Sequence, residues 1–275
     1  MKIDSHQHFW QFDPVRDSWI NDEMQVIRRS FLPGDVAGIL TDNGVDGAVA
    51  VQADQSEKEN DFLLDLAVNN SFIKGIVGWV DFKADNVAER LAYYSQFKII
   101  KGFRYILQAE TNRALMLEPA FKHGIGLLQQ YGFTYDILIF PDQLKYAAEL
   151  AAAYPAQKFV LDHIAKPPIK SGEHTQWAAD LTLLAQNQNV WCKLSGMVTE
   201  ADWSTWKPED IKPYLDTVIA AFGVERCMFG SDWPVCLLAA DYKQVKELVE
   251  AYAGQFTVAE REKLFGGNAV EFYNL

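Results

Sequence analysis

Cysteine is scarce in this chain, and neither a long apolar run nor a leader segment is evident. The three cysteines, Cys192, Cys227 and Cys236, are too few among 275 residues, and odd in number, for a disulfide framework. No apolar stretch approaches the roughly 20 residues that a membrane-spanning helix needs. Because Met1 leads almost directly into a strand-like segment, no room remains for a signal peptide. These absences predict a cytoplasmic protein with reduced cysteines and no membrane segment.

Basic residues are outnumbered by acidic ones. The chain has 25 Lys and Arg against 37 Asp and Glu, which gives a formal net charge of −12. A nucleic-acid-binding protein needs a basic face to displace counterions from phosphate, and no basic run is present. Glycine-rich phosphate loops are missing too, since no strand is followed by G-x-G-x-x-G and no G-x-x-x-x-G-K-[ST] occurs. We therefore expect a small-molecule substrate, no nucleic acid and no membrane, and we leave a homo-oligomer open.

What the chain does have is a regular series of short apolar or alternating runs. Hydrophobic residues make up 49% and charged residues 23%, as in an average soluble globular protein. Eight runs start at a mean interval of about 32 residues, the length of one βα unit. They are Lys2–Phe9, Gly47–Gln52, Ile73–Asp81, Phe97–Ile106, Phe133–Phe140, Lys158–His163, Val190–Leu194 and Arg226–Gly230. Eight parallel strands in a chain of this length predict a single (β/α)₈ TIM barrel, one domain over residues 1–275.

Helix signals lie between these runs. Ser56-x-x-Glu59 and Thr257-x-x-Glu260 have the spacing of a capping box, in which each end residue bonds the backbone of the other. Pro141 and Pro208 are placed to open helices over 144–154 and 211–222. Two long connections, 10–32 and 203–213, follow the carboxyl ends of strands, where barrel enzymes build their sites.

The first run carries two histidines in the order Asp4-Ser-His6-Gln-His8. Residues two apart on a strand point to the same face, so His6 and His8 converge. Two such imidazoles can hold a divalent metal or grip an oxyanion without one. The alternative is a pair of polar core residues. Because the chain has five histidines in all, two of them together at a strand end favour a functional site.

Two further candidates end other strands. His163 follows an apolar run in Leu161-Asp162-His163, and Asp232 follows the last run in Gly230-Ser231-Asp232-Trp233-Pro234. In a closed barrel the first and eighth strands are neighbours, so Asp232 should lie beside the histidine pair. A carboxylate there can take a proton from water or ligate the same ion. Taken alone, Asp232 would be read as a turn residue before a proline.

Cationic and aromatic residues are also expected at the carboxyl ends of strands. Arg104, Lys166 and Lys193 are candidates for binding an anion or a polyol, with salt bridges to nearby carboxylates as the alternative. The flat faces of Trp10, Trp79 and Trp233 suit a ring-shaped substrate, although such residues also serve as plain packing. Asp162 should face away from His163 and is interpreted as a structural residue. His123 and His174 are interpreted as surface residues, and the three cysteines as small buried apolar ones.

Together these motifs resemble the amidohydrolase superfamily. The segments that carry the resemblance are Asp4-Ser-His6-Gln-His8-Phe9-Trp10, Asp162-His163-Ile-Ala-Lys166-Pro167, Lys193-Leu-Ser195-Gly196, Phe229-Gly230-Ser231-Asp232-Trp233-Pro234 and the C-terminal Gly267-Asn268-Ala269 with Phe272-Tyr273. They are similar to the amidohydrolase-2 branch, and within it to sugar-lactone hydrolases of the L-fuconolactonase and L-rhamnonolactonase type. The similarity spans residues 4 to 273.

The resemblance implies roles for individual residues. Asp232 would activate the hydrolytic water and return its proton to the leaving oxygen, with His163 as a second catalytic residue and Arg104 as a substrate-binding one. It also implies at most one divalent metal, such as zinc, held by His6, His8, His163 and Asp232, and a metal-free enzyme stays possible. Binuclear relatives carry a bridging Lys or Glu on a middle strand and another strand-end His. This chain departs from that pattern, because it has Arg104 on the middle strand and no second histidine in 190–196.

Three functions follow from these observations. The first is a hydrolase that opens the ring of a small sugar lactone, with Asp232 activating water. The second is a metal-dependent decarboxylase of a planar aromatic acid, or another amidohydrolase-type C–O or C–N hydrolase. The third is a barrel that binds a metabolite without turning it over, because a fold by itself does not determine chemistry. The Asp162-His163-Ile-Ala-Lys166-Pro167 segment favours the first.

Overall fold

The computed structural model describes residues 1–275 and contains one sheet of eight parallel strands in sequence order. The strands are β1 (Ile3–Gln7), β2 (Gly47–Val51), β3 (Ile73–Gly78), β4 (Ile100–Ile106), β5 (Thr134–Leu138), β6 (Phe159–Leu161), β7 (Val190–Leu194) and β8 (Cys227–Phe229). The first and last strands meet just beyond β8, where the His8 N–H donates to the Trp233 carbonyl at 2.7 Å and the Asp232 N–H to the His6 carbonyl at 2.9 Å. These bonds close the sheet, which confirms the predicted (β/α)₈ barrel.

All eight predicted strands form, and several end earlier than their apolar runs suggest. β6 stops at Leu161 and β8 at Phe229, so His163 and Gly230 lie outside the strands. The reason at β6 is a change of backbone: His163 has a φ of 53° and Ile164 a φ of 48°. Such left-handed conformations cannot continue a pleated strand. The polar ends of the runs are therefore loops that begin where the buried strand ends.

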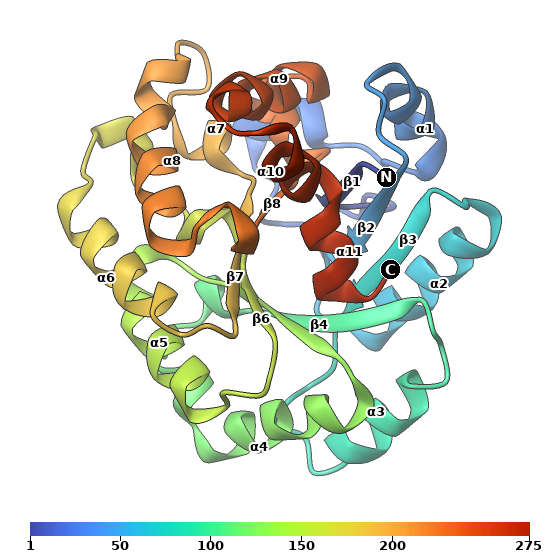
Figure 1. Cartoon of the computed structure of the whole chain (residues 1–275). Helices are drawn as coiled ribbons and strands as arrows, with labels where there is room; N and C mark the ends of the chain where they lie inside the picture. The colour runs from blue at the N-terminus through green and yellow to red at the C-terminus, as the bar shows by residue number, and fades with distance from the viewer.

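Helices surround the barrel (Figure 1). They are α1 (Pro33–Asp42), α2 (Glu57–Asn69), α3 (Val87–Tyr94), α4 (Pro119–Leu128), α5 (Leu144–Ala153), α6 (Thr175–Ala185), α7 (Met197–Glu200), α8 (Pro208–Phe222), α9 (Tyr242–Tyr252), α10 (Val258–Glu262) and α11 (Asn268–Tyr273). The capping box at Thr257 forms as predicted, with bonds in both directions between Thr257 and Glu260. The box at Ser56 does not. Ser56 bonds Asp54, and Glu59 accepts instead from the Ala53 N–H at 2.9 Å.

The C-terminal helix closes one end of the barrel. Phe272 and Tyr273 of α11 pack against apolar side chains that the strands direct into the barrel, among them Ile3, Val49 and Val77. Because Ile3 is the first residue of β1, α11 lies at the amino ends of the strands, near the N-terminus (Figure 1). The carboxyl ends therefore remain as the open end of the barrel.

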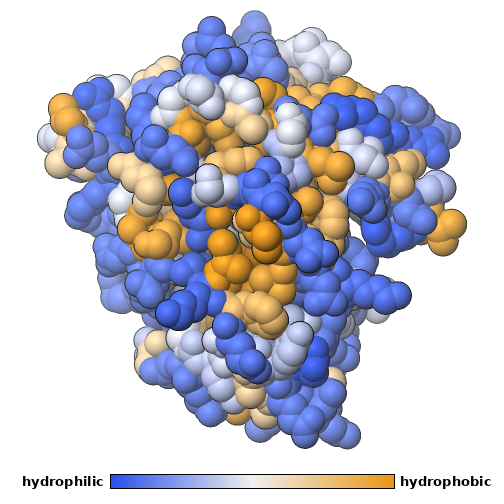
Figure 2. Space-filling view, turned by 90° about the vertical axis from the view of Figure 1, so that its right-hand side faces the viewer, coloured by the Kyte–Doolittle hydropathy of each residue, from blue (hydrophilic) through white to orange (hydrophobic).

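The face in Figure 2 is mostly covered by hydrophilic residues, with a hydrophobic strip along its middle. Screening the helices for length and apolar character finds no candidate for a membrane span. The three cysteines are free and buried, in agreement with their interpretation as small apolar residues. His123 is exposed as expected, whereas His174 is half-buried and bonds Thr217 at 2.8 Å.

Candidate active site

The candidate site lies at the carboxyl ends of the strands. β1 supplies His6 and is followed by His8, His163 follows β6, and Asp232 follows β8. All four side chains are at least 94% buried. The structure thus brings together the four residues that the sequence analysis grouped, from positions up to 226 residues apart along the chain.

The imidazoles surround the Asp232 carboxylate. Asp232 Oδ1 lies 3.4 Å from His8 Nε2, 3.8 Å from His6 Nε2 and 3.8 Å from His163 Nε2. His8 Nδ1 donates to the Val51 carbonyl at 2.8 Å, because a carbonyl can only accept. A neutral His8 therefore presents the lone pair of Nε2 to the site. His163 is held from behind by Ser195, whose Oγ lies 2.9 Å from Nδ1.

Burial and charge set the ionisation of these groups. Burial lowers the pKa of His6 and of His163 well below the usual histidine value, so both rings are neutral at pH 7. Burial would raise the pKa of Asp232, but interactions with His163, His8 and Lys166 outweigh it and lower that pKa below its ordinary value. The arrangement therefore combines an ionised carboxylate with neutral imidazoles, which is the state a general base for water requires.

These residues also fit a divalent metal. The ligand atoms of His6, His8 and Asp232 all lie within 4.8 Å of one another, as do those of His6, Asp162 and His163. Nitrogen donors with one carboxylate are a typical zinc set, and the free lone pair of His8 Nε2 is the form that a metal needs. The chemistry of the donors is thus compatible with one cation.

His163 sits on a strained stretch of backbone. Four consecutive residues, His163 to Lys166, have positive φ between 48° and 60°. The ring packs directly over Gly196, where an added Cβ would lie 2.6 Å from His163 Nδ1. Left-handed conformations cost roughly 1–2 kcal/mol for each non-glycine residue. Strain of this kind persists where the surrounding structure holds it, and it is frequent at functional sites.

We expect Gly196→Ala to lose activity out of proportion to its loss of stability. The new methyl group would displace the His163 ring, and an error of about 1 Å in a catalytic group can cost about 10²-fold in rate. Gly172→Ala is the matched control, because Gly172 has nearly the same backbone conformation (φ 74°, ψ 9° against φ 65°, ψ 8°) and open space around it. Comparable melting temperatures with equal kcat in both variants would contradict this expectation.

Below the site lies a layer of buried charges. Arg104 of β4, Asp136 of β5, Asp162 after β6 and Lys193 of β7 are at most 3% exposed. Lys193 Nζ lies 2.5 Å from Asp136 Oδ2 and 3.0 Å from Asp162 Oδ1, and Arg104 Nη1 lies 3.1 Å from Asp162 Oδ2. Two positive and two negative groups balance within the layer. Barrel interiors are usually filled by branched apolar residues, so a charged layer here points to the site above it.

This layer changes two expectations. Asp162 does not face away from the site: its Oδ1 lies 3.4 Å from His6 Nδ1. Lys193 points into the barrel interior, with a side chain that is 0% exposed, and does not line the open cavity. It is the last residue but one of β7, two positions before Ser195, so it lies deeper in the barrel than the strand end. Lys193 therefore contacts His6 rather than a bound molecule.

A cavity of about 280 Å³ opens above the carboxylate. Six of the predicted residues line it: His8, Trp10, Arg104, His163, Lys166 and Asp232. Trp233 does not, because it is 1% exposed and packs between Phe9 and Phe31. Trp79 stands at a neighbouring hollow beside Gln55 and Glu59. The expected aromatic wall thus comes from Trp10 and from Trp19.

Several lining residues were missed by the sequence analysis. They are Trp19, Ala53, Gln55, Ile106, Gln108, Ala109, Leu138 and Val235. Trp19 lies within the long connection 10–32, so that connection was the available signal. Gln55 lies in the connection between β2 and α2, and Gln108 in a short 3₁₀ helix after β4, with no motif around either residue. The cavity therefore has a polar side, from Gln55, Gln108 and Lys166, and an apolar side.

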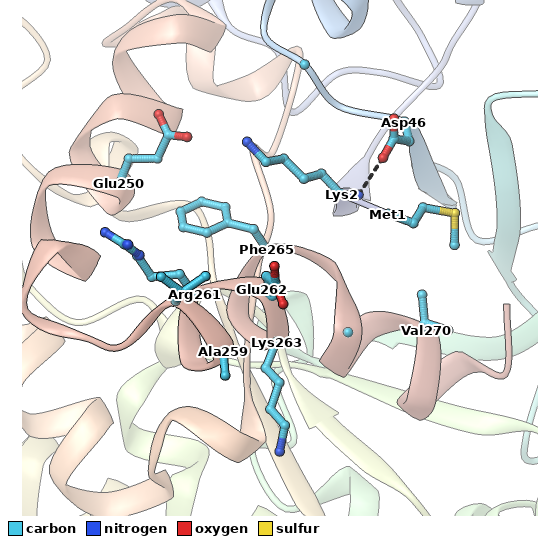
Figure 3. A pocket seen from close by; sticks show the side chains of 13 residues that line it. Met1, Lys2, Asp46, Glu250, Ala259, Arg261, Glu262, Lys263, Phe265 and Val270 are labelled. Carbon is cyan, nitrogen blue, oxygen red and sulfur yellow. Dashed lines mark hydrogen bonds between the residues drawn. The ribbon is translucent and has the colours of Figure 1, made fainter.

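A larger groove, of about 1040 Å³, lies at the opposite end of the barrel. Lys2 and Asp46, which border it, precede β1 and β2, and their backbone and side chain are joined at 2.7 Å (Figure 3). Arg261 and Glu250 line its other side around Phe265 (Figure 3). The groove contains none of the histidines and is far from Asp232 along the barrel axis. The smaller cavity is therefore the candidate active site.

Comparison with known proteins assigns the family. The family described as "Amidohydrolase" matches residues 3–275. An L-fucono-1,5-lactonase of Burkholderia multivorans is 40% identical over 286 residues, which covers 100% of this chain and 96% of that protein. An L-fucono-1,5-lactonase of Burkholderia ambifaria is 34% identical, covering 100% and 96%.

Solved structures agree with this assignment. An amidohydrolase from Burkholderia multivorans, crystallised with bound zinc, superposes with a TM-score of 0.97 at 40% identity, covering 100% of this chain and 99% of that one. A dihydroxybenzoic acid decarboxylase from Polaromonas is 15% identical with a TM-score of 0.72, over 100% and 97% of the two chains, so its likeness concerns the fold alone. With a family match over nearly its whole length and a relative that is 40% identical, this chain belongs to the amidohydrolase family.

Proposed function

We propose that this chain opens the ring of a sugar lactone by hydrolysis, and the Asp232 carboxylate is the observation that carries the proposal. Asp232 lies between three imidazoles at the base of a cavity, and its lowered pKa keeps it ionised. A carboxylate so placed is suited to take a proton from water. Two relatives that span the whole chain are L-fucono-1,5-lactonases, which supports a lactone as substrate.

The proposed reaction begins with proton transfer from a water molecule to Asp232. The water oxygen forms a bond to the lactone carbonyl carbon, and the carbonyl oxygen becomes negatively charged. Arg104 and Lys166 line the cavity and are the proposed donors to that oxygen. The bond between the carbonyl carbon and the ring oxygen then breaks, and Asp232 returns its proton to the ring oxygen. The product is the open-chain sugar acid.

A divalent metal fits the same residues, and we propose at most one zinc per chain. His6, His8, His163 and Asp232 would hold it. A bound zinc would polarise the lactone carbonyl as a Lewis acid. The crystal structure of the 40% identical amidohydrolase contains zinc, which supports this choice of metal.

We expect elemental analysis of protein purified without chelator to find one zinc per chain or none. Two metals per chain would contradict the proposed site, because Arg104 occupies the middle strand where a bridging group would be needed. If no metal is found, an activity assay with and without added zinc tests the metal-free reaction. In that case we expect the activity to be unchanged by zinc.

The substrate is proposed to be a neutral, polyhydroxylated lactone. Gln55, Gln108 and Lys166 offer polar groups to the cavity, and Trp10 with Trp19 offers flat surfaces. Arg104 is engaged by Asp162 and by Gln52, so its charge is already compensated. A net charge of −12 would repel an anionic substrate during approach. A hydroxylated ring therefore suits the cavity better than a strongly anionic one.

A pH-indicator assay on a panel of pentono- and hexono-lactones, with and without chelator, tests the function. Polar groups that are left unpaired penalise a substrate lacking hydroxyls, so kcat/KM for the best sugar lactone should exceed that for the unsubstituted ring by up to about 10⁴-fold. The unsubstituted lactone of the same ring size is the matched control. Equal hydrolysis of both rings would overturn the sugar-lactone assignment, and no hydrolysis of any lactone would overturn the function.

We further infer a cytoplasmic enzyme of carbohydrate catabolism. The three free and buried cysteines suit a reducing compartment. A sugar lactone is a typical intermediate between oxidation of a sugar and use of the sugar acid, so the preceding reaction would be an oxidation of the sugar at its anomeric carbon. Cell fractionation with an antibody against the native chain tests the location.

A further inference from the structure

A second hollow, of about 710 Å³, adjoins the catalytic cavity. The side chain of Gln55 lines both spaces. The long connection 10–32 also borders both, because Trp10 lines the cavity and the next residue, Gln11, lines the hollow. Trp79 of the hollow follows β3, so the hollow lies, like the cavity, at the carboxyl ends of the strands. The two spaces are therefore neighbours, with Gln55 between them.

Gln55 presents N–H groups at this junction. Its Oε1 accepts from the backbone N–H of Ile106 at 2.8 Å. Because a backbone N–H can only donate, the orientation of the amide is fixed and Nε2 remains as the donor. Nε2 has no hydrogen-bond partner in the chain and is not sealed from solvent. Gln55 can therefore donate to a hydroxyl oxygen of a bound molecule.

Glu59 adds a carboxyl group with an unused oxygen to the lining of the hollow. The residue is 5% exposed, and its Oε1 accepts from the Ala53 N–H at 2.9 Å. Its Oε2 has no hydrogen-bond partner and is not sealed from solvent. The cation Arg16 of the same hollow pairs with Asp17 at 2.8 Å, and burial raises the pKa of Glu59 to about 7. In either ionisation state the free oxygen can bond a hydroxyl, because a hydroxyl both donates and accepts.

The hollow also has a rigid aromatic wall, which is formed by Trp79. The Trp79 N–H donates to Asn60 Oδ1 and Asn60 Nδ2 donates to the Trp79 carbonyl, both at 2.7 Å. Asn60 is 0% exposed, so it holds the Trp79 backbone from the interior. The indole packs against the ring of Tyr105, with the ring centroids 6.3 Å apart. A fixed flat wall beside polar groups suits a ring that carries hydroxyls on an apolar carbon frame.

The charges around the hollow disfavour an anionic occupant. Three carboxylate residues, Asp54, Glu57 and Glu59, line it against two cations, Arg16 and Lys58. Arg16 is already engaged in its salt bridge, and Lys58 is exposed. A phosphate or carboxylate group on a substrate would therefore meet net negative charge here. A neutral, hydroxylated group fits the same lining.

The sizes of the two spaces match two rings. The catalytic cavity, of about 280 Å³, is at the lower end of the range for small-molecule sites, which is about 300–1,000 Å³. It has room for one small ring, and the hollow of about 710 Å³ has room for another. A substrate with two linked rings would therefore use both spaces, with Gln55 at the link.

We propose that the hollow is a subsite for a glycosyl group carried by the lactone ring, so that the enzyme also hydrolyses lactones of disaccharide acids. The lactone ring lies at Asp232 in this arrangement. The glycosyl ring lies against Trp79, with its hydroxyls bonded to Glu59 and Gln55. The proposal rests on the proposed lactonase function and adds a substrate class to it.

Steady-state kinetics on matched substrates test the subsite. The best single-ring lactone of the panel is compared with the same lactone carrying a glucosyl group on each of its hydroxyls in turn. We expect at least one glucosylated lactone to have a KM about tenfold lower at similar kcat, because a few added hydrogen bonds together supply about that factor. A glucosyl group without a subsite would leave KM unchanged or raise it. If no glucosylated lactone is a better substrate than its parent, the proposal is overturned.

Trp79→Leu removes the aromatic wall and leaves the lining of the catalytic cavity as it is. We expect it to lower kcat/KM for the preferred glucosylated lactone by about 2- to 10-fold, the usual contribution of one aromatic packing contact, and to leave the parent lactone unchanged. Trp206→Leu is the matched control, because Trp206 is also half-buried but lines neither space. Equal losses on both substrates in Trp79→Leu, or no loss on either, would contradict the proposal. The substrate comparison needs no variant, so it decides even if Trp79→Leu does not fold.

Calorimetric titration with the sugars that correspond to the two lactones separates the subsite from the lactonase function. These sugars have the same rings but no lactone carbonyl, so they bind without being hydrolysed. The disaccharide should bind about tenfold more tightly than the single sugar. Tighter binding of the disaccharide without hydrolysis of any lactone would support the subsite and overturn the lactonase function. Hydrolysis of single-ring lactones with no gain from the glucosyl group in either measurement would overturn the subsite alone.

Discussion

We expect Asp232→Asn to lower kcat for lactone hydrolysis by about 10²–10⁴-fold, the usual contribution of a general base. The amide has nearly the shape of the carboxylate but cannot take a proton from water. Asp232 is held by its neighbours on β1 and β8 through the backbone, since its N–H donates to the His6 carbonyl at 2.9 Å. The fold and the cavity should therefore survive the substitution, and the loss should appear in kcat rather than in stability.

A matched control for Asp232→Asn is Glu200→Gln, which also removes one carboxylate near Lys166. Glu200 lies 3.8 Å from Lys166 Nζ and does not line the cavity. Steady-state kinetics on the best lactone from the panel, together with thermal melting, compare the two variants. Near-normal kcat in Asp232→Asn would show that another group activates the water, and the assigned role would then be wrong.

The arrangement of the barrel could be predicted from the sequence because each strand has its own apolar run. Buried parallel strands are apolar on both faces, so all eight were recognised. Their order also placed Asp232 beside the histidines of β1, since the first and last strands of a closed barrel are neighbours. The positions of His6, His8 and Asp232 thus depend on regular strand geometry, which the sequence pattern contains.

Asp162 shows where that reasoning stops. Alternation along a strand places adjacent residues on opposite faces, and on this basis Asp162 was expected to point away from His163. β6 ends at Leu161, however, and the left-handed backbone begins at His163. Asp162 continues the inward face that Val160 begins, with Oδ1 3.4 Å from His6 Nδ1, and the left-handed backbone turns His163 inward as well, so that its ring lies 4.4 Å from the His6 ring. A run of four left-handed residues that includes Ile164 has no glycine or asparagine to announce it. Tertiary contacts impose this conformation, so a local pattern cannot reveal it.

Lys193 and Trp233 illustrate a second limit, which is depth. Lys193 lies near the carboxyl end of β7, and Trp233 lies in the loop after β8. Their positions along the chain do not tell whether the side chains reach the cavity. Lys193 is two residues short of Ser195 and therefore lies below the floor of the site, whereas Trp233 turns into the aromatic cluster with Phe9 and Phe31. Whether such a side chain lines the cavity or packs in the interior depends on its contacts in the folded protein. The residue type alone does not determine those contacts.

The buried charges themselves should be costly to disturb. We expect Asp162→Asn to lower the free energy of unfolding by about 3–5 kcal/mol, the usual effect of removing one partner from a buried ion pair. Asp162 is 0% exposed and lies between Lys193 Nζ at 3.0 Å and Arg104 Nη1 at 3.1 Å. Without its charge, two cations would share the single carboxylate of Asp136. Asp162 and Lys193 are both 0% exposed, so water cannot compensate them for the lost charge.

Asp142→Asn provides the matched surface substitution. Asp142 makes a two-point pair with Arg113, at 2.7 Å for each contact, but its side chain is 57% exposed. Exposed pairs of this kind contribute about 0–1 kcal/mol. Urea denaturation of both variants at neutral pH measures the difference. Comparable losses in the two variants would mean that the stability of the interior layer does not depend on its charge balance.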